Sequence, residues 1–119
     1  MLDNLCQIEI KVTDVKRSQE FYEHVFGLKL VPAEIHNYYL LEVSEKSTFG
    51  ISLLPQEKVE PNHSVILYFR LDSLDGIKEK LTSLESGCFR GERLVPGYGR
   101  AIFVEDPDGH RFGLFAAHT

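Results

Sequence analysis

The chain has 119 residues, of which 43% are hydrophobic and 26% are charged, and its formal net charge is −5. This balance is typical of a small globular domain and argues against nucleic-acid binding, which needs a concentration of basic residues. No apolar run approaches the roughly 20 residues that span a bilayer, and the first residues lack a signal-peptide pattern, so we expect a cytoplasmic protein. In that compartment Cys6 and Cys88 are expected to be free thiols.

The first half of the chain is predicted to form a strand, a helix and three further strands. Apolar and polar residues alternate from Gln7 to Val12, which indicates a strand with one apolar face. Asp14 is the expected N-cap of a helix that ends at Gly27, because apolar residues recur between them at a spacing of three and four. The further strands are predicted over residues 28–31, 38–43 and 49–54.

The second half repeats this pattern after a polar connection at residues 56–62. A strand is predicted over residues 65–71, where Leu67 and Phe69 alternate with more polar positions. A helix is then expected to begin at Asp72 or Ser73 and to end at Gly87.

The last third of the chain is predicted to complete the second sheet. A short strand is expected around Phe89 or Leu94, followed by a loop at 96–99 that is either a lid over a ligand or a disordered surface loop. The sequence Asp-Pro-Asp-Gly at 106–109 has residues that favour a tight turn, and apolar runs flank it on both sides. This pattern predicts a closing hairpin.

The repeat predicts an α+β fold in which one domain, residues 1–119, consists of two tandem βαβββ modules at about 5–55 and 63–117. Each helix is expected to cover one face of its own sheet. The helix-free faces would then curl around a shared cleft. We predict that a ligand binds there through Gln7, Glu9, Lys11, Ser52, Ile66, Tyr68, Arg70, Tyr98, Phe103 and Gly113.

Two stretches of the chain carry a resemblance to a known family. Residues 12–28, VTDVKRSQEFYEHVFGL, and residues 103–112, FVEDPDGHRF, resemble the first strand-to-helix passage and the last hairpin of the vicinal oxygen chelate superfamily. That superfamily includes glyoxalase I, bleomycin-resistance proteins, fosfomycin-resistance enzymes and extradiol dioxygenases. The resemblance implies the fold described above and a homodimer.

The resemblance also implies four positions at which metal-dependent members place metal ligands, usually His, Glu or Gln. In this chain the four positions hold Gln7, Ser52, Ile66 and Gly113. A divalent metal needs imidazole, thiolate or carboxylate donors in adequate number, and these residues supply only neutral oxygens. No metal site is therefore expected at these positions, although Gln7 and His63, with Glu9, are candidates for a shifted one.

Three functions follow as alternatives. The first is a non-enzymatic small-molecule binding protein of the bleomycin-resistance type, which needs no metal or other cofactor and takes an aromatic or cationic ligand. The second is a metal-dependent lyase, isomerase or dioxygenase with the shifted ligands Gln7, His63 and Glu9. The third is a structural or protein-interaction module. We expect the first.

Overall fold

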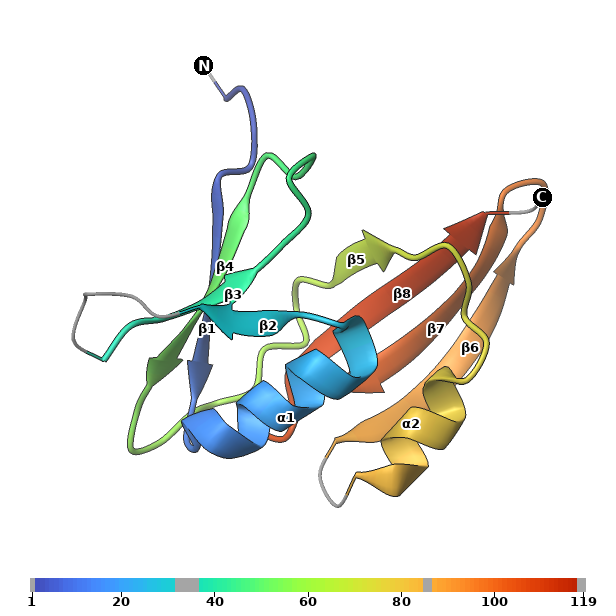
Figure 1. The fold of residues 1–119 in the computed structure, drawn as a ribbon. Helices are drawn as coiled ribbons and strands as arrows, with labels where there is room; N and C mark the ends of the chain where they lie inside the picture. Colours follow the sequence, from blue (N-terminus) through green and yellow to red (C-terminus); the bar gives the residue numbers. More distant parts are fainter. Residues whose placement is uncertain (1, 32–36, 85–86, 118–119) are drawn as a thin grey trace. The chain divides into compact units, whose positions relative to one another are not determined.

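The computed structural model describes residues 2–31, 37–84 and 87–117, which form two compact units, Met1–Val59 and Glu60–Thr119. Each unit has its own helix and its own four-stranded sheet (Figure 1). The predicted α+β architecture of two βαβββ repeats is confirmed. Within these ranges no helix has the length and apolar character needed to cross a membrane. The cleft between the modules stays a prediction.

The first unit contains β1 (Gln7–Val12), α1 (Val15–Phe26), β2 (Lys29–Val31), β3 (Tyr39–Glu42) and β4 (Gly50–Pro55). The strand order is β1-β4-β3-β2, and β1 runs parallel to β4 while the other pairs are antiparallel. Exposed and buried residues alternate strictly along β1, as the sequence predicted.

Helix α1 begins and ends where its capping residues predict. Asp14 accepts a hydrogen bond from the backbone N–H of Arg17, and Gly27 closes the helix with a left-handed φ of 73°. Between the caps, the side chains of Phe21 and Tyr22 are fully buried, and their rings contact each other edge to face at 5.1 Å. The helix packs on β2 and β4 of its own sheet through this apolar face.

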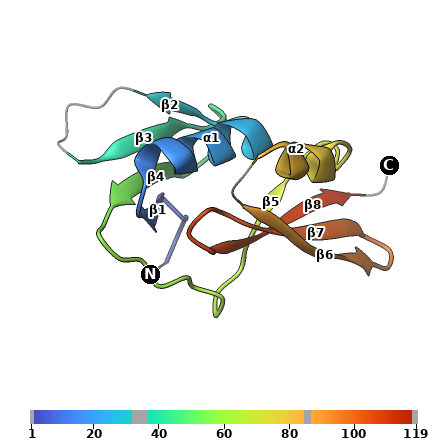
Figure 2. The same ribbon diagram turned by 90° about the horizontal axis from the view of Figure 1, so that it is seen from below.

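The second unit contains β5 (Leu67–Arg70), α2 (Ile77–Ser83), β6 (Cys88–Val95), β7 (Gly99–Glu105) and β8 (Arg111–Ala117). Its strand order, β5-β8-β7-β6, repeats that of the first unit, with β5 parallel to β8. Helix α2 lies on one side of this sheet (Figure 2) and contacts β6. On that side Lys78 of α2 lies over the ring of Phe89 at 4.6 Å.

Helix α2 is shorter than predicted, because it begins after Gly76 and not at Asp72 or Ser73. Gly76 has a φ of 80°, in the left-handed region that residues of a right-handed helix do not adopt. The helix can therefore begin only after Gly76. The hydroxyl of Ser73 instead accepts a hydrogen bond from the backbone N–H of Asp75 in the preceding turn. Strand β5 is also shorter than the predicted 65–71, and Val65 is exposed.

The predicted loop at 96–99 is a short, hydrogen-bonded turn at 96–98, and its role as a lid stays a prediction. Strand β6 runs for eight residues, to Val95, and the backbone N–H of Tyr98 donates to the carbonyl of Val95 in a tight turn into β7. The short strand expected around Phe89 or Leu94 is thus one longer strand, whose alternation is interrupted by a bulge between Phe89 and Gly91.

Candidate functional site

The face of the second sheet that lies opposite α2 is a candidate binding surface. Strand register places Tyr68 beside Gly113 and Gly113 beside Phe103, so these three residues form one row across β5, β8 and β7. Arg70 follows two residues after Tyr68 on the same face, with its guanidinium 5.7 Å from the ring centre of Phe115. We call this surface, formed by Tyr68, Arg70, Arg93, Phe103, Gly113 and Phe115, the open face.

Gly113 leaves room for the ring of Tyr68. A Cβ atom at position 113 would lie 2.5 Å from Cδ2 and 2.6 Å from Cε2 of Tyr68, well inside the contact distance of carbon atoms. The ring of Phe103 meets the ring of Tyr68 edge to face, with their centres 5.8 Å apart. Tyr68 remains 48% exposed, so its hydroxyl can reach a ligand.

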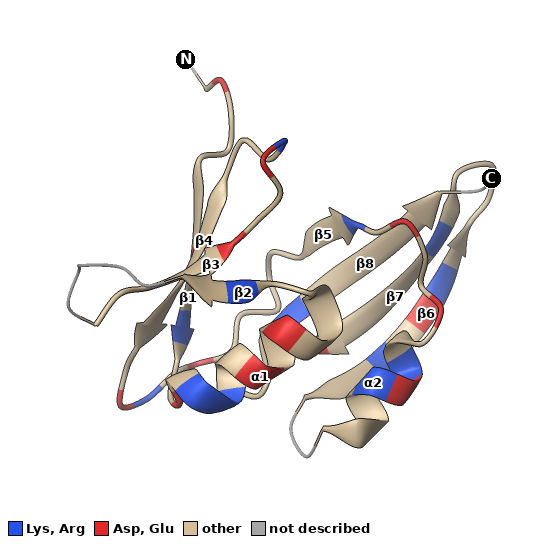
Figure 3. Ribbon diagram, in the orientation of Figure 1, with Lys and Arg blue, Asp and Glu red and all other residues tan. Residues whose placement is uncertain are grey.

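Arg93 of β6 lies in the next row of the same face, with Arg70, Phe115 and Ala101, and sequence reasoning did not find it. Its Nη2 donates to the Tyr68 hydroxyl at 3.2 Å, and its guanidinium lies 5.7 Å from the ring centre of Phe103. The register pairs Arg93 with Ala101, which turns it to the open face. Figure 3 shows basic residues on β5 and β6 of this sheet.

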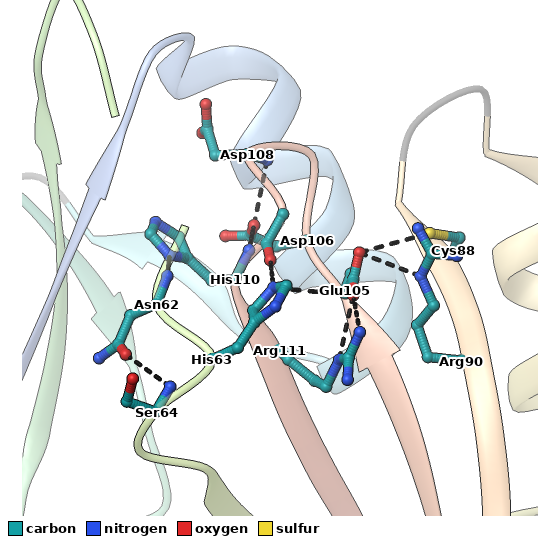
Figure 4. Close-up of polar contacts among 11 residues, drawn as sticks. Asn62, His63, Ser64, Cys88, Arg90, Glu105, Asp106, Asp108, His110 and Arg111 are labelled. Carbon is teal, nitrogen blue, oxygen red and sulfur yellow. Dashed lines mark hydrogen bonds and ion pairs between the residues drawn. The ribbon is translucent and has the colours of Figure 1, made fainter. Parts of the chain in front are cut away.

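Glu105 anchors one end of the same sheet (Figure 4). Its side chain is only 8% exposed and accepts hydrogen bonds from Arg111, through Nε at 3.0 Å and Nη2 at 2.6 Å. Arg90 Nε lies 3.1 Å from the other carboxylate oxygen. Burial raises the pKa of Glu105, but the hydrogen bonds from Arg111 and Arg90 outweigh it and hold the pKa below its ordinary value.

His63 and Cys88 also belong to this Glu105 cluster. His63 Nε2 lies 2.7 Å from the carbonyl oxygen of Gly109 and 3.8 Å from Glu105. The Cys88 thiol donates to Glu105 at 3.9 Å, and both Cys88 and Cys6 are free, as expected. His63 is therefore held by its own unit's hairpin.

The hairpin between β7 and β8 has the predicted turn. One carboxylate oxygen of Asp106 accepts from the backbone N–H groups of Asp108 at 3.0 Å and His110 at 2.8 Å, and Gly109 has a φ of 88°. These bonds fix the start of β8 and hence the position of Gly113 beside Tyr68.

In the first unit, the polar face of β1 holds the other predicted ligand residues. Gln7, Glu9 and Lys11 are exposed on alternate positions, and Glu9 pairs with the buried Ser52 of β4. Gln7 Nε2 donates to the Ser52 hydroxyl at 3.1 Å. The amide of Gln7 packs against Gly50, where an added Cβ atom would lie only 2.9 Å from Gln7 Oε1.

The predicted site residues thus fall into two sets. Gln7, Glu9, Lys11 and Ser52 lie together in the first unit, and Tyr68, Arg70, Phe103 and Gly113 lie together in the second. Ile66 precedes β5, and Tyr98 is 71% exposed in the turn after β6. A hollow of the second unit contains none of them; it is lined by Asp72, Ser73, Leu74, Asp75, Leu94, Arg100, Ala116 and Ala117.

The four aligned positions do not fit a divalent metal. Gln7 and Ser52 bind each other and carry no charge, Ile66 has no donor, and the space beside Gly113 is filled by the Tyr68 ring. Across residues 2–31, 37–84 and 87–117, no group of three or more His, Cys, Asp or Glu side chains could hold a metal ion.

The repeated βαβββ topology and the Asp106 hairpin are those of one protein class. A model of the Glyoxalase/Bleomycin resistance protein/Dioxygenase superfamily matches residues 4–114, and the chain belongs to this superfamily. The resemblance to the vicinal oxygen chelate superfamily is confirmed.

Particular relatives are enzymes by name. The chain is 27% identical to metallothiol transferase FosB of Lysinibacillus sphaericus, covering 93% of this chain and 80% of the relative. It is 26% identical to a probable trivalent organoarsenical cleaving enzyme of Bacillus subtilis, covering 91% and 76%. A mutant of the fosfomycin resistance protein FosX from Listeria monocytogenes, solved with Mn(II) and 1S,2S-dihydroxypropylphosphonic acid, has the same fold, with a TM-score of 0.79 at 21% identity over 99% of this chain and 93% of that one.

These comparisons correct the first functional interpretation. A metal-independent, non-enzymatic binding protein without a cofactor is wrong as the main expectation, because the relatives are named as a metallothiol transferase and a cleaving enzyme and FosX was solved with Mn(II). They favour the second alternative, a metal-dependent enzyme of the superfamily. The error arose because the lack of charged donors at the four positions was taken to exclude an enzyme.

Proposed function

We propose that this chain is an enzyme that transforms a small organic molecule bound on the open face of the second sheet, by group transfer or bond cleavage. The observation that carries the proposal is the open face itself, where a phenol and two guanidinium groups stand beside aromatic rings. Small-molecule sites combine apolar surface with a few placed polar groups in this way. The enzyme names of relatives that cover most of the chain support the reaction class.

This proposal assigns no residues of the chain as ligands of a metal such as the Mn(II) solved with FosX. Because the four aligned positions do not fit a metal, no step of the reaction is routed through one. Gln7, Glu9 and His63 are the donors to test. Of these, Gln7 and Glu9 share the exposed face of β1, while His63 binds the Gly109 carbonyl in the second unit.

What the chain's own residues supply is binding and orientation. The aromatic rings offer an apolar floor for the body of a substrate, and the guanidinium of Arg70 offers fixed positive charge beside it. The Glu105 cluster holds β6, β7 and β8 together through Arg90 and Arg111, so the floor is rigid. We also propose that the protein is cytoplasmic and forms a homodimer. Light scattering will measure its mass in solution.

The test is turnover by protein purified without chelator, after its metal content has been measured. The panel contains fosfomycin with a thiol, simple epoxides and an α-ketoaldehyde with a thiol, each with added Mn²⁺ or Zn²⁺ and followed by NMR. We expect turnover of at least one compound, reduced in Arg70→Gln and unchanged in Arg100→Gln. Arg100 carries the same charge but lies on the opposite face of β7, because it precedes Ala101, the partner of Arg93.

The metal enters this test through separate variants. Loss of a stoichiometric metal in Gln7→Ala, Glu9→Gln or His63→Ala would identify its donors. If no compound is turned over with either metal, the proposal is overturned in favour of a structural or interaction module.

A further inference from the structure

We propose that Arg93 and Tyr68 form the recognition site for the oxyanion group of a small organic ligand, a carboxylate or a phosphonate. The inference rests on the proposed function and names its substrate class. It replaces the expected cationic ligand with an anionic one, because the groups that face outward here are guanidinium groups and not carboxylates.

The charge of Arg93 is available, in contrast to that of its neighbours. Arg90 and Arg111 are both bound to Glu105, whereas no acidic side chain of the described residues forms an ion pair with Arg93. Glu92, the adjacent residue, pairs with Ile102 and so points to the other face. The Arg93 guanidinium can therefore bind the anionic group of a ligand.

The geometry also orients the Tyr68 hydroxyl as a donor. Its oxygen accepts the N–H of Arg93 at 3.2 Å, so its own hydrogen is directed at another acceptor. A ligand oxygen placed between the two side chains receives hydrogen bonds from the phenol and from the remaining N–H groups of the fork.

The aromatic surface beside this pair suits the organic body of the ligand. Tyr68 and Phe103 meet edge to face, and Arg93 stacks over Phe103, which restrains all three side chains. Because Gly113 has no side chain, nothing lifts the Tyr68 ring off the sheet. The pair is therefore preorganised for its ligand, which lowers the entropy cost of binding.

The test is titration of the full ¹⁵N-labelled chain with phenylphosphonate and, in a second arm, with benzoate. Benzamide, the neutral counterpart of benzoate, is the matched probe. We expect saturable shifts of the Tyr68, Arg93 and Phe103 amides with one or both anions and weaker binding of benzamide. The stronger of the two anions identifies the oxyanion.

Three variants make the assignment specific. Arg93→Gln should raise the dissociation constant about tenfold or more, and Tyr68→Phe should raise it about fivefold, since charged hydrogen bonds exceed neutral ones. Arg100→Gln, on the opposite face, should leave it unchanged. Circular dichroism will confirm that each variant is folded.

Several outcomes overturn the inference. Equal affinity for benzamide, no effect of Arg93→Gln, or loss of binding in Arg100→Gln, whose side chain lines the hollow near α2, would each do so. Turnover with an unchanged KM in Arg93→Gln would refute this site and leave the proposed enzyme standing. Anion binding on the open face without any turnover would support this site and refute the proposed enzyme.

Discussion

Gly113→Ala is the most direct perturbation of the open face. The new Cβ would lie 2.5 Å from Cδ2 and 3.0 Å from Cγ of Tyr68, so the ring has to move from its present position beside Phe103 and Arg93. Overpacking of this kind costs about 1–3 kcal/mol. The φ of Gly113 is not in the left-handed region, so alanine also stabilises the strand by about 0.4–1 kcal/mol through the unfolded state. We expect a net loss of about 0–2.6 kcal/mol.

A double-mutant cycle isolates the steric term. In a Tyr68→Ala background the obstacle is gone, and Gly113→Ala should stabilise the protein by about 0.4–1 kcal/mol. The coupling energy between the two positions should therefore be about 1–3 kcal/mol, measured by urea unfolding followed by circular dichroism. Coupling below about 0.5 kcal/mol would mean that the ring moves freely and is not seated on Gly113, and the reasoning would fail.

The remaining predictions concern the supports of the sheets. Glu105→Gln should lower the free energy of unfolding by about 1–3 kcal/mol, because charged hydrogen bonds from Arg111 and Arg90 are weakened. The pKa of Glu105 is lowered in the folded state, so its contribution to stability is complete above the unfolded pKa and is lost as the pH falls through the folded pKa. The free energies of unfolding of wild type and variant should therefore converge in acid. A difference that stays constant with pH would contradict this. Asp14→Ala removes the cap of α1 and should cost about 0.5–2 kcal/mol in urea unfolding, with Asp14→Asn nearly neutral as the control. Gly109→Ala, at a φ of 88°, should cost about 1–2 kcal/mol in thermal unfolding, and an unchanged melting temperature would refute the strain.

The elements with regular periodicity were predictable from the sequence. The alternation in β1 and the caps of α1, Asp14 and Gly27, are local signals that the tertiary structure leaves intact. The start of α2 was not predictable, because Ser73 is a good cap residue and only the left-handed Gly76 shows that the helix begins later. Strand β6 was predicted only as a short strand, because its bulge next to Gly91 breaks the alternation on which such predictions depend.

The candidate site was predictable only in part, because its residues come from strands that are far apart in the sequence. Tyr68, Phe103 and Gly113 were expected on the helix-free face from their own strands. That Tyr68 lies directly beside Gly113 depends on the register of β5 against β8, which no local pattern contains. Arg93 was missed because the length and register of its strand were not predicted, so the phenol–guanidinium pair was not expected.

The same register explains why the sheet cannot hold both the Tyr68 ring and a metal-binding side chain at position 113. A His, Glu or Gln side chain at position 113 needs the volume that the Tyr68 ring fills, since even a single carbon atom there comes within 2.5 Å of the ring. A ring at position 68 and a metal-binding side chain at position 113 are therefore alternatives at one place on the sheet. In this chain the ring occupies that place, and its hydroxyl is held by Arg93. The absence of a metal-binding side chain at position 113 and the proposed oxyanion site are thus two consequences of one packing arrangement.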